Sequence, residues 1–145
     1  MPDRVLIVGA SLAGVRTAEA LRRCGHAGEV LLVGAEPGSD EGVAADRPPL
    51  SKAFLADPRT PAPPLTSRAR LAELDVRLVT GRAVDVDLGC GSVAVHGGKG
   101  LPFDVLVVAT GSTPRTVPGL EPRPGVHALR TAADAAAIRA AAAQA

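Results

Sequence analysis

The feature that most limits how this chain can fold is a strand, a glycine turn, a helix and a second strand in direct succession. Residues 4–9 (RVLIVG) are a continuous apolar run, as expected of a strand buried on both faces of a parallel sheet. Residues 12–24 then show helical spacing of their apolar side chains, and Gly25 is a typical helix stop. Residues 29–34 (EVLLVG) are a second apolar run. Together these segments predict a βαβ unit with a right-handed crossover.

Later segments predict that this unit belongs to a larger α/β fold. Residues 76–79, 83–88 and 92–96 have the length of short strands and alternate more than the first two, which indicates an antiparallel ribbon over roughly 83–96. Residues 103–109 (FDVLVVA) are another apolar run, expected to be buried on both faces. We therefore expect a Rossmann-like, mostly parallel sheet with helices on both faces and a small antiparallel ribbon.

The connecting segments are richer in proline and glycine. Residues 35–64 are expected to form a long loop, with a short helix over 51–56. A helix over residues 66–74 is predicted, with Thr66 or Ser67 as its N-cap.

An alanine-rich helix is expected to begin at Thr131, where Asp134 stands at capping-box spacing. We accordingly predict one domain over residues 1–130, followed by a terminal helix over 131–145.

Composition excludes several classes of protein. The chain has 145 residues, is 46% hydrophobic and 21% charged, and carries a formal charge of +1. This suits one compact domain, and a charge near zero without a basic run argues against nucleic acid as the main partner. Apolar stretches stay below the roughly 18–20 residues that a membrane span needs, and no signal segment is expected. We therefore expect neither a nucleic acid nor a membrane partner.

The cysteines and histidines do not indicate a redox or metal centre. Cys24 and Cys90 lie too far apart for a paired metal motif and do not form a disulfide framework, which favours a reduced, cytoplasmic protein. Cys24 is expected to be a buried helix residue and Cys90 a hairpin-turn residue. His26, His96 and His127 have no ligand spacing and are expected to be solvated, so no metal is assigned.

The glycine turn carries the first chemical signal. Residues 9–14 (GASLAG) follow a strand and open a helix, which is the context that a dinucleotide-binding fingerprint requires. Gly9 permits the tight turn, Gly14 allows close approach of helix and strand, and the helix N-terminus offers N–H groups to a pyrophosphate. Ser11 replaces the usual second glycine, which weakens the motif, although its hydroxyl can bond a phosphate.

An acidic residue follows the second strand. Glu36 stands where a carboxylate can accept hydrogen bonds from a ribose diol and would repel a 2′-phosphate, which favours FAD or NAD over NADP. The alternative is an ordinary glycine-containing turn with a surface glutamate.

A second cluster is Asp46-Arg47-Pro48-Pro49-Leu50-Ser51-Lys52. Its two prolines fix the backbone and hold Arg47 and Lys52 in a defined relation, with Ser51 as a possible N-cap. From these residues alone, a rigid surface turn with solvated charges is the simpler interpretation.

Three segments taken together resemble one family. VLIVGASLAGVRTAEALRRCG, ADRPPLSKAFL and FDVLVVATGSTPR occur in the order found in FAD-dependent NAD(P)H–ferredoxin reductases of the rubredoxin, putidaredoxin and dioxygenase-system type. These enzymes belong to the pyridine nucleotide–disulfide oxidoreductase superfamily. The resemblance runs from the start of the sequence to about Leu129, and RPPLSK is its most particular motif.

The resemblance implies FAD as cofactor and a role for each matched residue. Gly9, Ser11 and Gly14 would line the pyrophosphate, and Glu36 the adenosine ribose. Lys52 would lie beside the flavin ring, where a cation stabilises the reduced, anionic flavin; it is the catalytic candidate. The cofactor-binding candidates are Gly9, Ala10, Ser11, Leu12, Ala13, Gly14, Glu36, Arg47, Lys52, Val84, Ala109, Thr110, Gly111 and Arg115.

The remaining roles also come from the resemblance. Arg47 would contact the ribose–phosphate region, Val84 the adenine through its backbone, and Arg115 the flavin or the pyrophosphate. Gly111 would allow close approach of the chain to the cofactor. For Thr110, direct contact and a simple strand-end turn remain equally open.

Some family features are absent from this sequence. A thiol–disulfide mechanism is not expected, because the segment after the second strand holds RPPLSK where dithiol members have a cysteine pair. Ala44-Ala45-Asp46 replaces the usual Pro-Tyr pair, and the loop before Arg47 is a few residues longer. Full-length relatives are more than twice as long and continue into a second glycine-rich unit that binds NAD(P)H.

We therefore expect the FAD-binding portion of an oxidoreductase that passes electrons from NAD(P)H through flavin to a ferredoxin-like iron–sulfur protein. The 145-residue chain alone is expected to bind FAD or its adenylate half without being a competent enzyme. The alternatives are a stand-alone nucleotide-binding module, and a non-catalytic remnant that needs a second chain.

Overall fold

The computed structural model describes residues 3–36, 42–120 and 123–144. The chain divides into two compact units, Met1–Ala44 with Pro64–Gly111 and Ala45–Pro63 with Ser112–Ala145. Each unit is described by itself. The expected domain boundary after residue 130 does not coincide with this division and stays a prediction.

A four-stranded parallel sheet forms the centre of the first unit. Its strand order is β5-β2-β1-β9, with the central pair formed by β1 (Arg4–Val8) and β2 (Glu29–Gly34). β5 (Val76–Thr80) pairs with β2, and β9 (Val105–Val108) pairs with β1, all in parallel. The mostly parallel α/β fold expected from the sequence is confirmed, and the short strand expected over residues 76–79 is β5 of this sheet.

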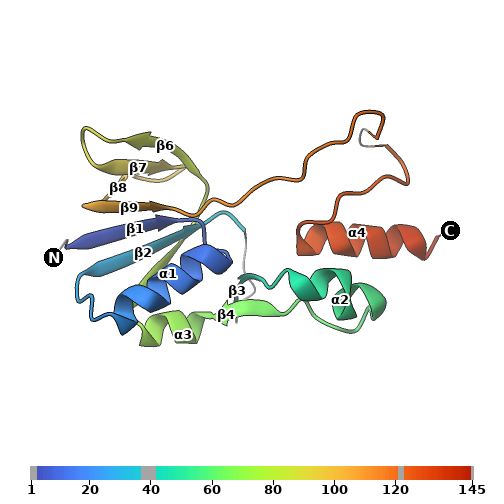
Figure 1. The fold of residues 1–145 in the computed structure, drawn as a ribbon, viewed down its shortest axis with the longest axis horizontal. Helices are drawn as coiled ribbons and strands as arrows, with labels where there is room; N and C mark the ends of the chain where they lie inside the picture. The colour runs from blue at the N-terminus through green and yellow to red at the C-terminus, as the bar shows by residue number, and fades with distance from the viewer. Residues whose placement is uncertain (1–2, 37–41, 121–122, 145) are drawn as a thin grey trace. The chain divides into compact units, whose positions relative to one another are not determined.

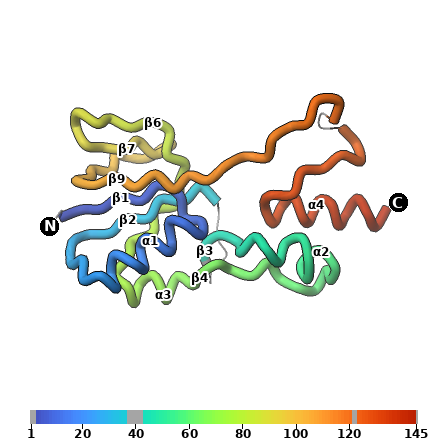
Figure 2. Tube along the Cα trace, viewed as in Figure 1, coloured from blue at the N-terminus to red at the C-terminus, as the bar shows by residue number. Residues whose placement is uncertain are grey.

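Two different layers cover the two faces of this sheet (Figures 1 and 2). Helices α1 (Leu12–Arg23) and α3 (Arg68–Glu73) lie on one face, where Val5 and Ile7 of β1 share a core with Val15. On the other face, Leu6 and Val8 share a core with Val93 and Val95. The alternate side chains of a strand point to opposite faces, so a strand covered on both sides must be apolar throughout.

The second covering layer is a three-stranded antiparallel sheet, in the order β6-β7-β8. It comprises β6 (Ala83–Asp87), β7 (Ser92–Val95) and β8 (Leu101–Pro102). The expected ribbon is therefore confirmed and has one more strand than expected. It occupies the face on which further helices were expected; among the described residues of this unit, helices cover only the opposite face.

Strand β9 departs from its prediction. It was expected to be buried on both faces, but Val105 is 40% and Val108 is 70% exposed. The reason is its position, because β9 is an edge strand of the four-stranded sheet and, among the described residues, pairs with β1 alone.

The expected long loop contains more regular structure than predicted. β3 (Gly42–Ala45) and β4 (Pro64–Ser67) form a two-stranded sheet, and residues 37–41 lie outside the described residues. The Ser67 hydroxyl accepts a hydrogen bond from the Arg70 N–H at 3.0 Å and caps α3. This confirms one of the two predicted caps of that helix.

In the second unit, a 3₁₀ turn (Pro48–Ser51) leads into α2 (Ala53–Ala56), close to the short helix expected there. Ser51 is not an N-cap: Arg47 and Lys52 hold the cap positions, and the Ser51 hydroxyl instead donates to the Pro48 carbonyl at 3.5 Å.

Helix α4 (Ala132–Ala142) packs on these short helices. Ala135 forms a small core with Leu50 and Phe54. The Arg139 guanidinium lies 4.9 Å from the centre of the Phe54 ring and donates to the Phe54 carbonyl at 2.9 Å. A cation over an aromatic face adds to the burial of the ring in holding this unit together.

The predicted capping box of α4 is present. The Thr131 hydroxyl accepts from the Asp134 N–H at 3.2 Å, and the Asp134 carboxylate accepts from the Thr131 N–H at 2.7 Å. This backbone hydrogen bond from Thr131 is the main cause that lowers the pKa of Asp134; a further bond from the Arg130 N–H acts in the same direction.

Acid is therefore expected to weaken α4. Because the pKa of Asp134 is lower in the folded state, its stabilising contribution is complete above the unfolded-state pKa near 4 and is lost as pH falls through the folded-state value. An Asp134→Asn variant should have a lower free energy of unfolding at neutral pH. Its free energy of unfolding should also fall less on acidification than that of the parent. The helical circular dichroism signal, followed between pH 7 and pH 2, measures both. Parallel acid profiles of the two proteins would contradict this.

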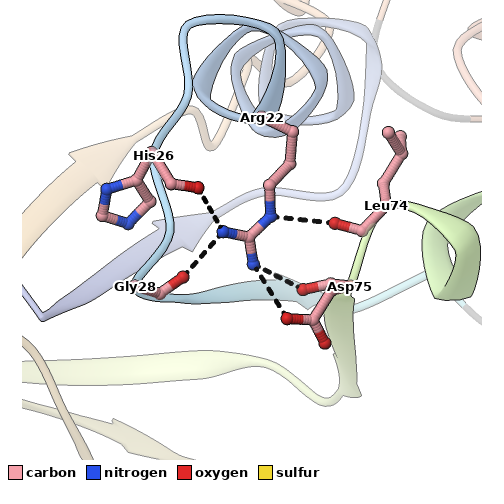
Figure 3. Close-up of polar contacts among 5 residues, drawn as sticks. All are labelled: Arg22, His26, Gly28, Leu74 and Asp75. Carbon is pink, nitrogen blue, oxygen red and sulfur yellow. Dashed lines mark hydrogen bonds and ion pairs between the residues drawn. The ribbon is translucent and has the colours of Figure 1, made fainter.

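The C-terminal end of α1 is fastened by a buried arginine (Figure 3). The Arg22 guanidinium, with a side chain only 12% exposed, donates to the carbonyl groups of Leu74 at 2.8 Å and of His26, Gly28 and Asp75 at 2.7 Å. It thereby joins the end of α1 to the start of β2 and to the turn before β5.

The burial of two neighbouring residues is the reverse of the expectation. Cys24 is exposed, because the helix ends at Arg23 and the chain turns away at Gly25, whose φ is +83°. His26 is only 7% exposed, because the chain folds back so that its N–H donates to the Leu21 carbonyl at 3.0 Å. Among the described residues, its Nε2 atom has no hydrogen-bond partner.

Other features of the first unit agree with the sequence. Cys90 lies in the β6–β7 turn as predicted, where its N–H donates to Asp87 at 2.9 Å and lowers the pKa of that carboxyl. His96 is exposed, as expected. In the parts of the chain that the structure describes, no helix has the length and apolar character needed to cross a bilayer.

Candidate functional site

A cavity of about 180 Å³ lies at the carboxyl end of the parallel sheet in the first unit. Residues that end or directly follow all four strands line it: residues 8–11 after β1, 33–36 after β2, 81–83 after β5 and Thr110 after β9. Parallel strands bring their carboxyl ends to one edge of a sheet, so residues from distant parts of the sequence meet here.

The position of this cavity follows from the topology. From β1 the chain passes through α1 to β2 on one side, whereas β9 lies on the other side of β1. Such a reversal of strand order opens a crevice outside the carboxyl ends, where open α/β sheets bind ligands.

The two fingerprint glycines are required by close backbone contacts. Gly9 has a φ of +116°, and a Cβ atom there would lie 2.0 Å from the Ala109 carbonyl oxygen. A Cβ atom on Gly14 would lie 1.8 Å from the Gly9 carbonyl oxygen. The first turn of α1 therefore lies directly against the ends of β1 and β9, and its N-terminus opens at the cavity.

Ser11 is the N-cap residue of α1, but its side chain makes no capping hydrogen bond. The first N–H groups of a helix have no intrahelical acceptor, and the first turn of α1 contains no acidic residue. The Ser11 hydroxyl and these N–H groups thus form a donor set suited to an anion. Leu12 and Ala13 are exposed in this turn without lining the cavity, whereas Ala10 lines it.

Two charged residues line the cavity, Glu36 at the end of β2 and Arg82 after β5. Glu36 was predicted here, but Arg82 was missed. Its signal is its place two residues after β5, a strand that the sequence predicted without assigning it to the parallel sheet. Hydrogen bonds from Gly81 N–H to the Gly34 carbonyl (2.8 Å) and from His96 N–H to the Arg82 carbonyl (2.9 Å) hold this segment.

A second cavity, of about 400 Å³, lies between β6 and β9 of the same unit. Val84, which is 56% exposed, lines it together with Val86, Leu106 and Val108, and Thr110 lines both cavities.

Residues 109–111 follow β9, and Thr110 among them lines both cavities. Ala109 is half-buried, and Gly111 has a positive φ of +74°. Its backbone conformation is one that side-chain-bearing residues rarely adopt.

The other predicted residues, Arg47, Lys52 and Arg115, belong to the second unit. Lys52 and Arg115 are exposed there. Arg47 lines a cavity of about 300 Å³ with Leu50, Ser51, Leu129 and Arg130. Arg130 was not among the predicted residues, and its only sequence signal is its place before the capping box. This unit therefore has its own candidate anion site, with two arginines and a hydroxyl.

Comparison with known proteins decides the family. The model of the pyridine nucleotide-disulphide oxidoreductase family matches residues 3–145. The chain belongs to this family. That result confirms the resemblance carried by the three sequence segments. Helix α1, the glycine turn before it and the carboxyl edge of the parallel sheet are therefore features of a protein of this family.

Several of the curated proteins that this chain resembles are ferredoxin reductases. The chain is 37% identical over 140 residues to the ferredoxin–NAD(+) reductase component of the p-cumate 2,3-dioxygenase system of Pseudomonas putida, covering 95% of this chain and 34% of that protein. It is 38% identical over 145 residues to putidaredoxin reductase of Pseudomonas putida, covering 94% and 33%. The chain thus spans about a third of the length of these curated relatives.

Solved structures of the family agree. In the covalent putidaredoxin reductase–putidaredoxin complex, the matching chain has a TM-score of 0.78 at 34% identity, covering 95% of this chain and 34% of that chain. A ferredoxin reductase from Rhodopseudomonas palustris has a TM-score of 0.82 at 29% identity, with the same coverage.

Proposed function

We propose that this chain binds the adenosine diphosphate half of FAD in the cavity at the carboxyl end of the sheet. The observation that carries the proposal is that the ends of four parallel strands line one cavity together with Ser11, the N-cap residue of α1, whose side chain makes no capping hydrogen bond. Family membership supports a nucleotide as the ligand.

The residues present fit this ligand. Gly9 and Gly14 bring the backbone N–H groups of α1 to the cavity without side chains in between, and the Ser11 hydroxyl adds a donor where a pyrophosphate would lie. The Glu36 carboxylate can accept hydrogen bonds from both ribose hydroxyls. Val8, Val33 and Ala83 provide apolar wall.

For the second unit we propose contacts to the rest of the cofactor. Arg47 would contact the ribose–phosphate region, and Arg115 the flavin or the pyrophosphate. Lys52, as the catalytic residue, would supply a cation beside the flavin ring. When bound, FAD would supply the redox chemistry, namely acceptance of a hydride and release of single electrons. Val84, Ala109, Thr110 and Gly111 complete the proposed contacts of the first unit.

For the complete protein we propose an oxidoreductase that passes electrons from NAD(P)H through FAD to a ferredoxin-like iron–sulfur protein. The names of the relatives support this, and the nicotinamide site would come from polypeptide beyond these residues or from a second chain. We also propose a cytoplasmic location, because Cys24 and Cys90 are free and exposed, as expected in a reducing compartment.

The absorbance spectrum of the purified chain, before and after addition of FAD, tests the proposal. We expect flavin to be retained through gel filtration after FAD is added. A protein that stays colourless at saturating FAD, and that binds no adenosine diphosphate by calorimetry, would overturn it.

The ribose contact gives a more specific expectation. Glu36→Gln should weaken binding of adenosine diphosphate by about tenfold or more, because hydrogen bonds to a charged acceptor contribute about 1.5–3 kcal/mol. It should weaken binding of adenosine 2′,5′-bisphosphate much less, since the repelling carboxylate is removed. Glu73→Gln, on the exposed surface of α3, is the matched control. Equal losses for both ligands would contradict the assignment.

A further inference from the structure

The proposed nucleotide leaves one group without an assigned side chain, the adenine base. Along the sheet edge, the end of β1 carries the pyrophosphate donors and the end of its neighbour β2 carries the ribose acceptor. The next strand in the order is β5. Neighbouring strands lie about 4.8 Å apart, so the end of β5 is about 10 Å from that of β1. A base attached to the ribose would extend toward the residues that follow β5.

Arg82 stands at this point. It lines the cavity and is exposed, and within the described residues its guanidinium makes no hydrogen bond or ion pair. Its backbone is fixed, because the Arg82 carbonyl accepts from the His96 N–H and the preceding residue bonds to the end of β2. The preceding residue, Gly81, has no room for a side chain, because a Cβ atom there would lie 2.4 Å from Val95 Cγ1. Arg82 thus combines a backbone held by hydrogen bonds with a guanidinium that has no partner among the described residues.

Aromatic side chains are not available to stack on the base. The sequence contains no Trp and no Tyr, and its two Phe residues are Phe54 and Phe103. Phe54 is buried in the core of the second unit, and Phe103 packs in the core between the two sheets. Among the residues that line the cavity, the guanidinium of Arg82 is the only planar cation. Guanidinium groups are weakly hydrated and stack well on flat rings.

We propose that Arg82 is a specificity-determining residue that stacks its guanidinium on the adenine ring of the bound nucleotide. This rests on the proposed function. Stacking selects a flat base by shape, whereas the N-terminus of α1 and Glu36 select the diphosphate and the ribose. Arg82 accordingly supplies the part of the recognition that distinguishes a nucleotide from a simple sugar phosphate.

Binding of adenosine diphosphate to the full 145-residue chain, measured by calorimetry at low and high salt, tests the proposal. Arg82→Gln should raise the dissociation constant by about 3- to 30-fold at both salt concentrations. Arg82→Lys should lose most of the same affinity, because an ammonium group is not planar. Arg82→Trp should restore binding, because an aromatic ring stacks on a base. Arg23→Gln, an exposed arginine at the other end of α1, is the matched control and should bind like the parent.

Each other outcome overturns the proposal in a recognisable way. If Arg82→Lys binds like the parent and Arg82→Trp does not, Arg82 acts as a charge toward phosphate. If Arg82→Gln binds like the parent, the residue has no role, and the proposed function stands. If the parent chain binds neither FAD nor adenosine diphosphate, the proposed function itself fails, and this inference fails with it.

Discussion

Replacing Gly9 by alanine is expected to lower the free energy of unfolding by about 2–5 kcal/mol and to abolish nucleotide binding. Two costs add: the residue has a φ of +116°, and its new methyl group would meet the Ala109 carbonyl oxygen at 2.0 Å. Relieving that contact requires the end of β1 to move away from β9, which opens the cavity edge. Urea denaturation followed by far-ultraviolet circular dichroism gives the stability, and calorimetry gives the binding.

Gly25→Ala is the matched control for this expectation. Gly25 also has a positive φ, +83°, but a Cβ atom there would meet nothing within 4 Å. Its replacement should cost only the backbone strain, about 1 kcal/mol, and leave binding unchanged. If both variants lose the same stability, the close approach of Gly9 to β9 is not a determinant of the fold.

Replacing Arg22 by methionine is expected to lower the free energy of unfolding by about 3 kcal/mol. Methionine can fill the space of the aliphatic stem, but the carbonyl groups of Leu74, His26 and Gly28 would lose their charged donor. Hydrogen bonds to a charged group contribute about 1.5–3 kcal/mol each, and some of the freed carbonyls would regain water. The same urea denaturation experiment measures the loss.

Arg16→Met on the same helix is the control. Arg16 is exposed and forms an ion pair with Glu19 at 2.6 Å, an arrangement that contributes at most about 0.5 kcal/mol. A loss at Arg22 no larger than that at Arg16 would show that the buried guanidinium does not hold the end of α1 to β2 and β5.

The parts of the fold that the sequence predicted depend on local pattern. The β1–α1–β2 unit was predictable, because apolar runs of strand length, a glycine turn and helical spacing lie within 31 consecutive residues. The capping box at Thr131 was predictable for the same reason, because its two partners are three residues apart.

The parts that the sequence missed depend on which distant segments become neighbours. An apolar run such as β9 does not reveal whether it has one neighbouring strand or two, so the exposure of Val108 could not be foreseen. Arg82 enters the site only because β5 pairs with β2 in parallel. Arg22 resembles any basic residue near a helix end, and two of the four carbonyl groups that it binds belong to the distant residues Leu74 and Asp75.

The most direct test of the proposed site is a titration of the ¹⁵N-labelled chain with adenosine diphosphate, followed by NMR. We expect the largest amide shifts at Gly9, Ser11, Glu36, Arg82 and Thr110, which end or follow the four parallel strands. Amides on the β6–β7 turn, such as Cys90, should not move. Shifts confined to residues away from this edge, or no shifts at saturating ligand, would contradict the assignment of the nucleotide site.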